Sequence, residues 1–223
     1  MTFGLAAAKL TVFAAASLTG VFPQIDKAPR YSFAGSDQLA FQIQQGAPAD
    51  VFAAASPKYP EQLYAQGILF KPHVFATNEL VLIVPRANDA GIHSVYDLQR
   101  SGVRLVIGAQ GVPVGDYARK ALAALGLSSV LKNVVSEETD VKGVVAKVAL
   151  GEADAGFVYR TDALAARRDV TAIKLPQQAE PSIAYELAVV RSTKHLKAAR
   201  AFVARVLGKP GRLALARAGF GLP

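Results

Sequence analysis

The sequence contains no cysteine, only three histidines and few aromatic residues. Without cysteine the chain can form no disulfide, no thiolate metal site and no thiol nucleophile. His73, His93 and His195 lack the spacing of metal ligands, and no serine lies in the Gly-x-Ser-x-Gly pattern of a hydrolase. Because the sequence shows no catalytic set of acid, base and nucleophile, we do not expect an enzyme. We also expect no bound metal cation and no cofactor.

Long apolar runs are also missing. No uninterrupted run reaches the roughly 18 residues that span a bilayer, although 52% of the 223 residues are hydrophobic. This length suits one large domain or two lobes of about 100 residues each. The first eight residues, MTFGLAAA, end in small residues like a signal-peptide cleavage region but lack its basic and apolar parts. We expect the trimmed start of an exported protein, with an ordinary cytosolic N-terminus as the alternative.

Positive charge exceeds negative charge by eight, and the excess lies in one region. Eight lysines and arginines but no acidic residue occur from Arg191 to Pro223. A nucleic-acid surface would interleave aromatic residues with such cations, but only Phe202 and Phe220 are available there. We therefore interpret this region as a solvated helical face and expect no nucleic-acid partner.

Short apolar segments alternate with helical patterns along the chain, which predicts βα units around mostly parallel sheets. Helices are expected after Ser17, after Ser36 and over 139–151, where valines share one helical stripe. The expected strands are 10–15, 31–33, 49–56, 79–85, 103–108, 153–159 and 185–190.

No low-complexity linker divides the chain. A two-lobed molecule would therefore pass from lobe to lobe along strands, near 80–84 and 184–190. This division predicts lobe I from 1–82 and 186–223, with both termini, and lobe II from 83–185. The crevice between two such lobes is the default ligand site.

Four strand ends lead into helices through residues that can donate hydrogen bonds at close quarters. Helix N-termini leave free N–H groups and a partial positive charge, which suits an anion. Each turn also has a purely structural interpretation: Ser17 and Ser36 would cap their own helices, and the side chain of Val141 would belong to the core. The four turns are Ser17, Gly35-Ser36, Val114-Gly115 and Asp140-Val141.

The chain contains, in order, VFAAASLT, FAGS, LAFQIQQGAPADVFAAAS, NELVLIVP, PVGDYARKAL, GEADAGFVYRTDA and GFGLP. Together these segments resemble the periplasmic molybdate-binding protein family, the receptors of ABC-type molybdate importers. GAPADVFAAAS and ADAGFVYRTDA are more specific to this family than to related sulfate and iron receptors. The resemblance covers nearly the whole chain.

The resemblance implies a type II periplasmic binding fold of two α/β lobes, each a mostly parallel sheet flanked by helices, with molybdate or tungstate held in the cleft. It also implies that the ligand is bound without any metal cation, by hydroxyl groups of Ser17, Ser36 and Tyr159 and by backbone N–H groups of the two serines, Val114 and Val141. The expected protein is a monomeric receptor in the periplasm or outside the cell that delivers the oxyanion to the permease of an ABC importer.

A pocket made only of donors suits a bare dianion. Molybdate is fully deprotonated at neutral pH, whereas phosphate usually keeps a proton whose burial without an acceptor costs about 1 to 3 kcal/mol. Sulfate is also a bare dianion, so its exclusion depends on cavity size. Two alternatives stay open: a receptor for sulfate or phosphate, and a ligand-sensing or enzymatic domain on the same fold.

The chain departs from the family pattern in two ways. Asp37, Asp116 and Asp140 stand beside the expected donors, and a carboxylate that faced the cleft would repel a dianion. As residues of helical first turns, we expect them to face outward. The segment from Ser17 to Ser36 is also about two helical turns shorter than in the family, so the first helix should be brief or irregular.

Overall fold

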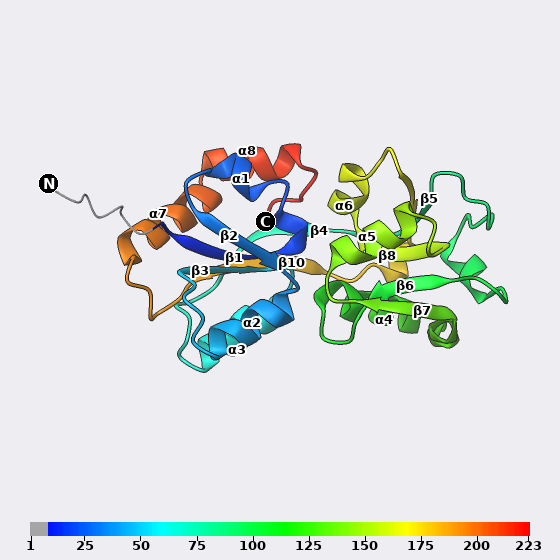
Figure 1. The fold of residues 1–223 in the computed structure, drawn as a ribbon, viewed down its shortest axis with the longest axis horizontal. Coiled ribbons are helices and arrows are strands. Elements are labelled where there is room, and N and C mark those ends of the chain that lie inside the picture. The colour runs from blue at the N-terminus through cyan, green and yellow to red at the C-terminus, as the bar shows by residue number, and fades with distance from the viewer. Residues whose placement is uncertain (1–8) are drawn as a thin grey trace, which may run out of the picture.

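The computed structural model describes residues 9–223, which form two lobes that lie side by side (Figure 1). The MTFGLAAA segment, where we expect a trimmed signal peptide, lies outside the described residues. Within the described part of the chain, no helix is long and apolar enough to cross a membrane.

Lobe I carries both ends of the described chain and has a five-stranded sheet (Figure 1). Its strands are β1 (Thr11–Ala15), β2 (Arg30–Ala34), β3 (Val51–Ala54), β4 (His73–Asn78) and β10 (Ile183–Val189). They lie in the order β2-β1-β3-β10-β4. Its helices are the 3₁₀ helix η1 (Ala16–Leu18), α1 (Phe22–Ile25), α2 (Ser36–Gln44), α3 (Lys58–Ala65), α7 (Leu196–Leu207) and α8 (Lys209–Arg217).

Lobe II is the middle of the chain and also has a five-stranded sheet. Its strands are β5 (Leu80–Pro85), β6 (Leu105–Gly108), β7 (Val134–Glu138), β8 (Ala155–Tyr159) and β9 (Val170–Lys174). They lie in the order β7-β6-β8-β5-β9. Its helices are α4 (Pro113–Ala124), α5 (Val141–Ala149) and α6 (Arg160–Ala165), with 3₁₀ helices η2 (Val95–Gln99), η3 (Ser128–Asn133) and η4 (Gln177–Ala179).

Both sheets are mixed rather than mostly parallel. In lobe I, β1 runs parallel to β2 and β3, whereas β10 is antiparallel to β3 and β4. In lobe II, β6 runs parallel to β7 and β8, whereas β5 is antiparallel to β8 and β9. The antiparallel strands β5 and β10 are those that follow the two crossings between lobes. The predicted two-lobed α/β architecture is confirmed.

The parallel strands point their carboxyl ends at the space between the lobes, which places the turns after them there (Figure 1). The central strands β3 and β8 are short apolar runs, and every one of their residues is buried. The first helical segment is brief, as the short spacing between Ser17 and Ser36 predicts, since only η1 and the four-residue α1 fit between β1 and β2.

Candidate ligand-binding site

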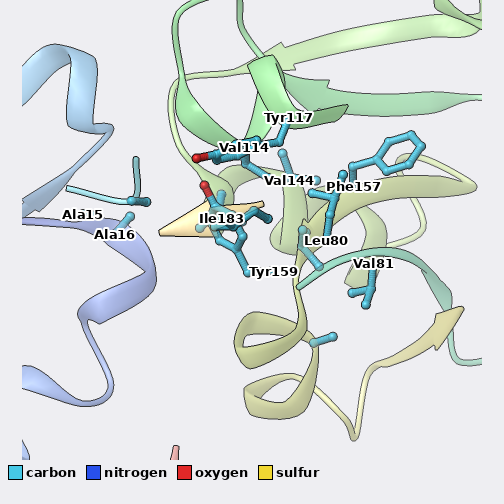
Figure 2. Packing of buried hydrophobic residues seen from close by; sticks show 14 of the residues in the cluster. Ala15, Ala16, Leu80, Val81, Val114, Tyr117, Val144, Phe157, Tyr159 and Ile183 are labelled. Carbon is cyan, nitrogen blue, oxygen red and sulfur yellow. The ribbon is translucent and has the colours of Figure 1, made fainter. Parts of the chain in front are cut away.

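A cavity between the lobes brings together all five residues that are predicted from the sequence to bind ligand. Ser17 and Ser36 come from lobe I, and Val114, Val141 and Tyr159 come from lobe II. Figure 2 shows Ala15 and Ala16 on one side, opposite Val114 and Tyr159 on the other. The full lining is Ala15, Ala16, Ser17, Ala34, Gly35, Ser36, Ala55, Val112, Pro113, Val114, Asp140, Val141 and Tyr159.

Small residues let the backbone of lobe I come close to the cavity. Four alanines line it where three strands end, together with Gly35. A Cβ atom at Gly35 would collide with the carbonyl oxygen of Thr139 in lobe II. Glycine at this position therefore allows the two lobes to touch.

Ser36 is the first residue of α2, so its N–H group has no acceptor within the helix. The N-cap is Gly35, and the Ser36 side chain makes no capping bond, so the interpretation of Ser36 as a simple cap is wrong. Its Oγ instead accepts a hydrogen bond from the N–H group of Ala55 at 3.1 Å. The hydroxyl hydrogen of this buried serine remains available to a ligand.

Ser17 lies in η1, directly after β1, and makes no capping bond either. Its Oγ lies 3.0 Å from the hydroxyl oxygen of Tyr185 on β10. Both side chains are buried. The contact ties the serine at the cavity to a strand next to the crossing between lobes.

Val114 and Val141 present backbone N–H groups from lobe II. Val114 is the second residue of α4 and Val141 the first of α5, so neither N–H group has an acceptor in its own helix. The carboxylate of Asp140 caps α5 by accepting from the N–H groups of Lys142 at 2.7 Å and Gly143 at 3.2 Å. The N–H group of Val141 therefore remains available to a ligand in the cavity. The side chain of Val141 packs in the core.

Tyr159, the last residue of β8, places a hydroxyl group without a partner among the described residues at the cavity. Its side chain is only 1% exposed. Burial raises the pKa of the phenol well above its usual value, so the group keeps its proton and stays a donor. A buried hydroxyl that lacks a partner costs about 1 to 3 kcal/mol, a cost that an acceptor in the cavity would remove.

The cavity lining contains no lysine or arginine among residues 9–223. Nowhere in that part of the chain do three histidine, aspartate or glutamate side chains gather to hold a metal ion. Lys142, next to Val141, directs its ammonium group to Asp162 at 2.6 Å. Attraction for an anion therefore comes from hydroxyl groups and helix N-termini.

The three acidic residues near the donors differ in their surroundings. Asp140 is among the residues that line the cavity, and its carboxylate accepts hydrogen bonds from the first turn of α5 through Oδ1. Asp116 accepts from the N–H group of Gly111 at 2.9 Å and pairs with Lys58 at 3.1 Å. Asp37 is outside the lining, and burial raises its pKa.

Sequence reasoning missed Tyr185 and Asn78, the buried polar residues behind Ser17. Both stand at the edges of apolar strand segments, and their hydroxyl and amide groups reach the site only after residues far apart in sequence come together. A tyrosine at the start of an apolar strand is ordinarily a core residue. The one feature of the sequence that could have pointed to Tyr185 is its position within the predicted crossing at 184–190.

Known proteins match the chain over nearly its whole length. A family described as bacterial extracellular solute-binding protein matches residues 10–221. Molybdate-binding protein ModA of Mycobacterium tuberculosis is 39% identical over 227 residues, covering 97% of this chain and 86% of that protein. The solved structure of the Azotobacter vinelandii periplasmic molybdate-binding protein matches with a TM-score of 0.86 and 25% identity, covering 96% of this chain and 100% of that one.

A second solved structure has the same fold. The sulfate-binding protein SubI of Mycobacterium tuberculosis matches with a TM-score of 0.82 and 19% identity, covering 96% of this chain and 86% of that one. At that identity the likeness shows the fold alone. The choice between ligands therefore depends on the residues of the cavity.

Proposed function

Because the chain belongs to the family of bacterial extracellular solute-binding proteins, we propose that it is a receptor that binds molybdate or tungstate between its lobes. The family is one of receptors rather than enzymes. One observation carries the proposal: uncharged donors from both lobes converge on one cavity whose described lining holds no cation. The molybdate-binding relatives support the same ligand class.

The donor set favours an oxyanion that carries no proton. Ser17, Ser36 and Tyr159 supply hydroxyl groups, and Val114 and Val141 supply N–H groups. Molybdate and tungstate can accept at every oxygen, whereas the proton of hydrogen phosphate would face mainly donors. The one carboxylate of the lining, Asp140, uses its Oδ1 to cap α5, and a buried proton left without an acceptor costs about 1 to 3 kcal/mol. Sulfate satisfies the same donors, so we propose that the distance between lobes excludes this smaller anion.

The lobes would close on the ligand by turning about the two crossings of the chain. The crossings lie at Glu79, between β4 and β5, and over 175–182, between β9 and β10. They lie close to the predicted crossings near 80–84 and 184–190. The division into 1–82 with 186–223 and 83–185 stays part of this proposal.

We propose that the protein works as a monomer outside the cytoplasmic membrane and delivers its oxyanion to the permease of an ABC importer. Its membership in an extracellular family supports the location. Closure would give the permease a surface that differs between the loaded and the empty receptor. This difference would let the permease recognise a loaded receptor.

Thermal unfolding with sodium molybdate, tungstate, sulfate and phosphate tests the proposal. A ligand at about 100 times its dissociation constant adds about 2.7 kcal/mol of stability, so molybdate and tungstate should raise the melting temperature and the other two should not. Ser17→Ala and Ser36→Ala should each reduce that rise, while Ser101→Ala, at an exposed position in lobe II, should keep it. A rise with sulfate or phosphate alone would overturn the ligand assignment.

A further inference from the structure

A chain of buried polar side chains connects the crossing between lobes to Ser17. The amide nitrogen Nδ2 of Asn78 lies 2.9 Å from Oγ1 of Thr161 and 3.4 Å from the hydroxyl oxygen of Tyr185. That hydroxyl in turn lies 3.0 Å from Oγ of Ser17. All four residues are less than one-tenth exposed. Of these residues, only Ser17 lines the ligand cavity.

The direction of each hydrogen bond follows from Asn78. Its Oδ1 accepts the N–H group of Glu79 at 2.9 Å, so its NH₂ group faces Thr161 and Tyr185. An amide nitrogen can only donate, so the Tyr185 oxygen accepts. The phenolic hydrogen is then free to point at the Oγ atom of Ser17.

We propose that Tyr185 is a positioning residue that fixes Ser17 as a donor toward the ligand and so helps to select unprotonated oxyanions. Once Tyr185 donates to Ser17, the serine cannot give its own hydrogen to Tyr185. That hydrogen turns to the cavity instead. The inference rests on the proposed oxyanion site. It makes Tyr185, a residue outside the cavity, one of the residues that determine which oxyanion the site binds.

The surroundings of Tyr185 suit such a role because they hold its ring in place. The ring packs edge-on against Phe75, Tyr159 and Phe220, with centroids 6.0, 5.7 and 5.4 Å away. Burial also raises the pKa of the phenol well above its usual value, so the group keeps its hydrogen. Tyr185→Phe should retain this packing and remove only the hydroxyl group.

The test is a double-mutant cycle read by isothermal titration calorimetry with sodium molybdate. Tyr185→Phe should weaken molybdate binding about tenfold, the value of one hydrogen bond that orients a donor to an anion. In a Ser17→Ala background the same change should alter the affinity by less than about twofold, because Tyr185 then has no serine to orient. Equal losses in both backgrounds, or no loss in the parent protein, would overturn the inference.

Titration with sodium phosphate distinguishes this role from a loss of packing. Poorer packing should weaken the binding of both anions and leave the ratio of their affinities unchanged. Without Tyr185 to fix it, the hydroxyl of Ser17 can rotate and accept the proton of hydrogen phosphate. Tyr185→Phe should therefore narrow the ratio of molybdate to phosphate affinity. An unchanged ratio would contradict the specificity role.

Two further variants keep the result interpretable. Tyr31→Phe removes another lobe I hydroxyl group, which bonds to the carbonyl groups of Phe22 and Asp26 away from the cavity, and should leave both affinities unchanged. Asn78→Asp replaces the donor to Tyr185 with an acceptor, which should draw the phenolic hydrogen away from Ser17 and weaken molybdate binding even if Tyr185→Phe folds poorly.

If the parent protein binds no molybdate, the proposed function fails, whereas binding that depends on Ser17 but not on Tyr185 or Asn78 refutes this inference alone.

Discussion

The Nζ atom of Lys58 in lobe I lies 3.1 Å from Oδ2 of Asp116 in lobe II, so an ion pair spans the mouth of the cleft. Beside it, the hydroxyl group of Tyr59 donates to the carbonyl oxygen of Gly111 at 2.5 Å, again from lobe I to lobe II. The two contacts can form only when the lobes are close together. The structure therefore shows the closed arrangement of the lobes.

Lys58→Met should weaken ligand binding without destabilising either lobe, because the ion pair exists only in the closed form. The lysine side chain is 54% exposed, and exposed pairs contribute at most about 1 kcal/mol, so we expect a loss of about twofold to fivefold that shrinks at high salt. Calorimetry with molybdate at low and high salt measures it. Lys147→Met, which breaks a pair with Glu152 inside lobe II, is the control and should have no effect on affinity.

Most of the fold could be predicted because its central strands are short apolar runs. The segments predicted over 10–15, 79–85 and 153–159 contain β1, β5 and β8. The edge strands β4, β7 and β9 are absent from the predicted strands, since each has exposed positions and includes polar or charged residues. In these strands, pairing with a neighbour compensates for the missing apolar run, and pairing between distant segments cannot be seen in a single sequence.

Residues of the candidate site could be predicted from the sequence only where the short segment around them is itself distinctive. Ser17, Ser36 and Tyr159 stand in distinctive segments, and the structure brings them into one cavity. The partner of Ser17 could not be found because Tyr185 is 168 positions away. The place of Asp140 in the cavity lining also needs the structure, because the first turn of a helix has both a solvent side and a cavity side.

Glu186→Gln should stabilise the protein at alkaline pH. Glu186 is 7% exposed, and its Oε2 has no partner among the described residues. Burial, aided by the charge of Glu61, raises its pKa to about 7 from the ordinary 4.5. The folded state thus holds a proton that the unfolded state has lost between those values, so stability falls as pH rises from about 4.5 to 7.

The glutamine variant lacks this titration. It should gain on the order of 1 to 2 kcal/mol in free energy of unfolding at pH 8 and less at pH 5. Urea unfolding at the two pH values measures both. Equal gains at both values would show that Glu186 does not titrate in this range.

Gly35→Ala should block closure while leaving the unliganded protein stable. The added Cβ atom would collide with the Thr139 carbonyl oxygen across the cleft. Within lobe I it would also come 2.6 Å from Oδ1 of Asp37, but this is the end of a side chain that can turn away, whereas the backbone of Thr139 can be avoided only if the lobes separate. We expect molybdate affinity to fall more than tenfold, since the lobes can no longer bring both donor sets to the ligand. Gly20→Ala has nothing within 4 Å of its new atom and should bind normally. Small-angle scattering that still shows compaction of Gly35→Ala with molybdate would refute this explanation.

Tyr159→Phe should lower the affinity for molybdate without lowering the stability of the unliganded protein. The hydroxyl group that it removes is buried and has no partner among the described residues. The loss of a hydrogen bond to a charged ligand should weaken molybdate binding about tenfold to a hundredfold. Removal of an unpaired buried hydroxyl should leave the unliganded melting temperature equal or higher. Calorimetry and thermal unfolding of the same preparation measure the two effects, with Tyr96→Phe, at a 46% exposed position, as the control that changes neither. A fall in unliganded stability with unchanged affinity would mean that Tyr159 serves the fold rather than the ligand.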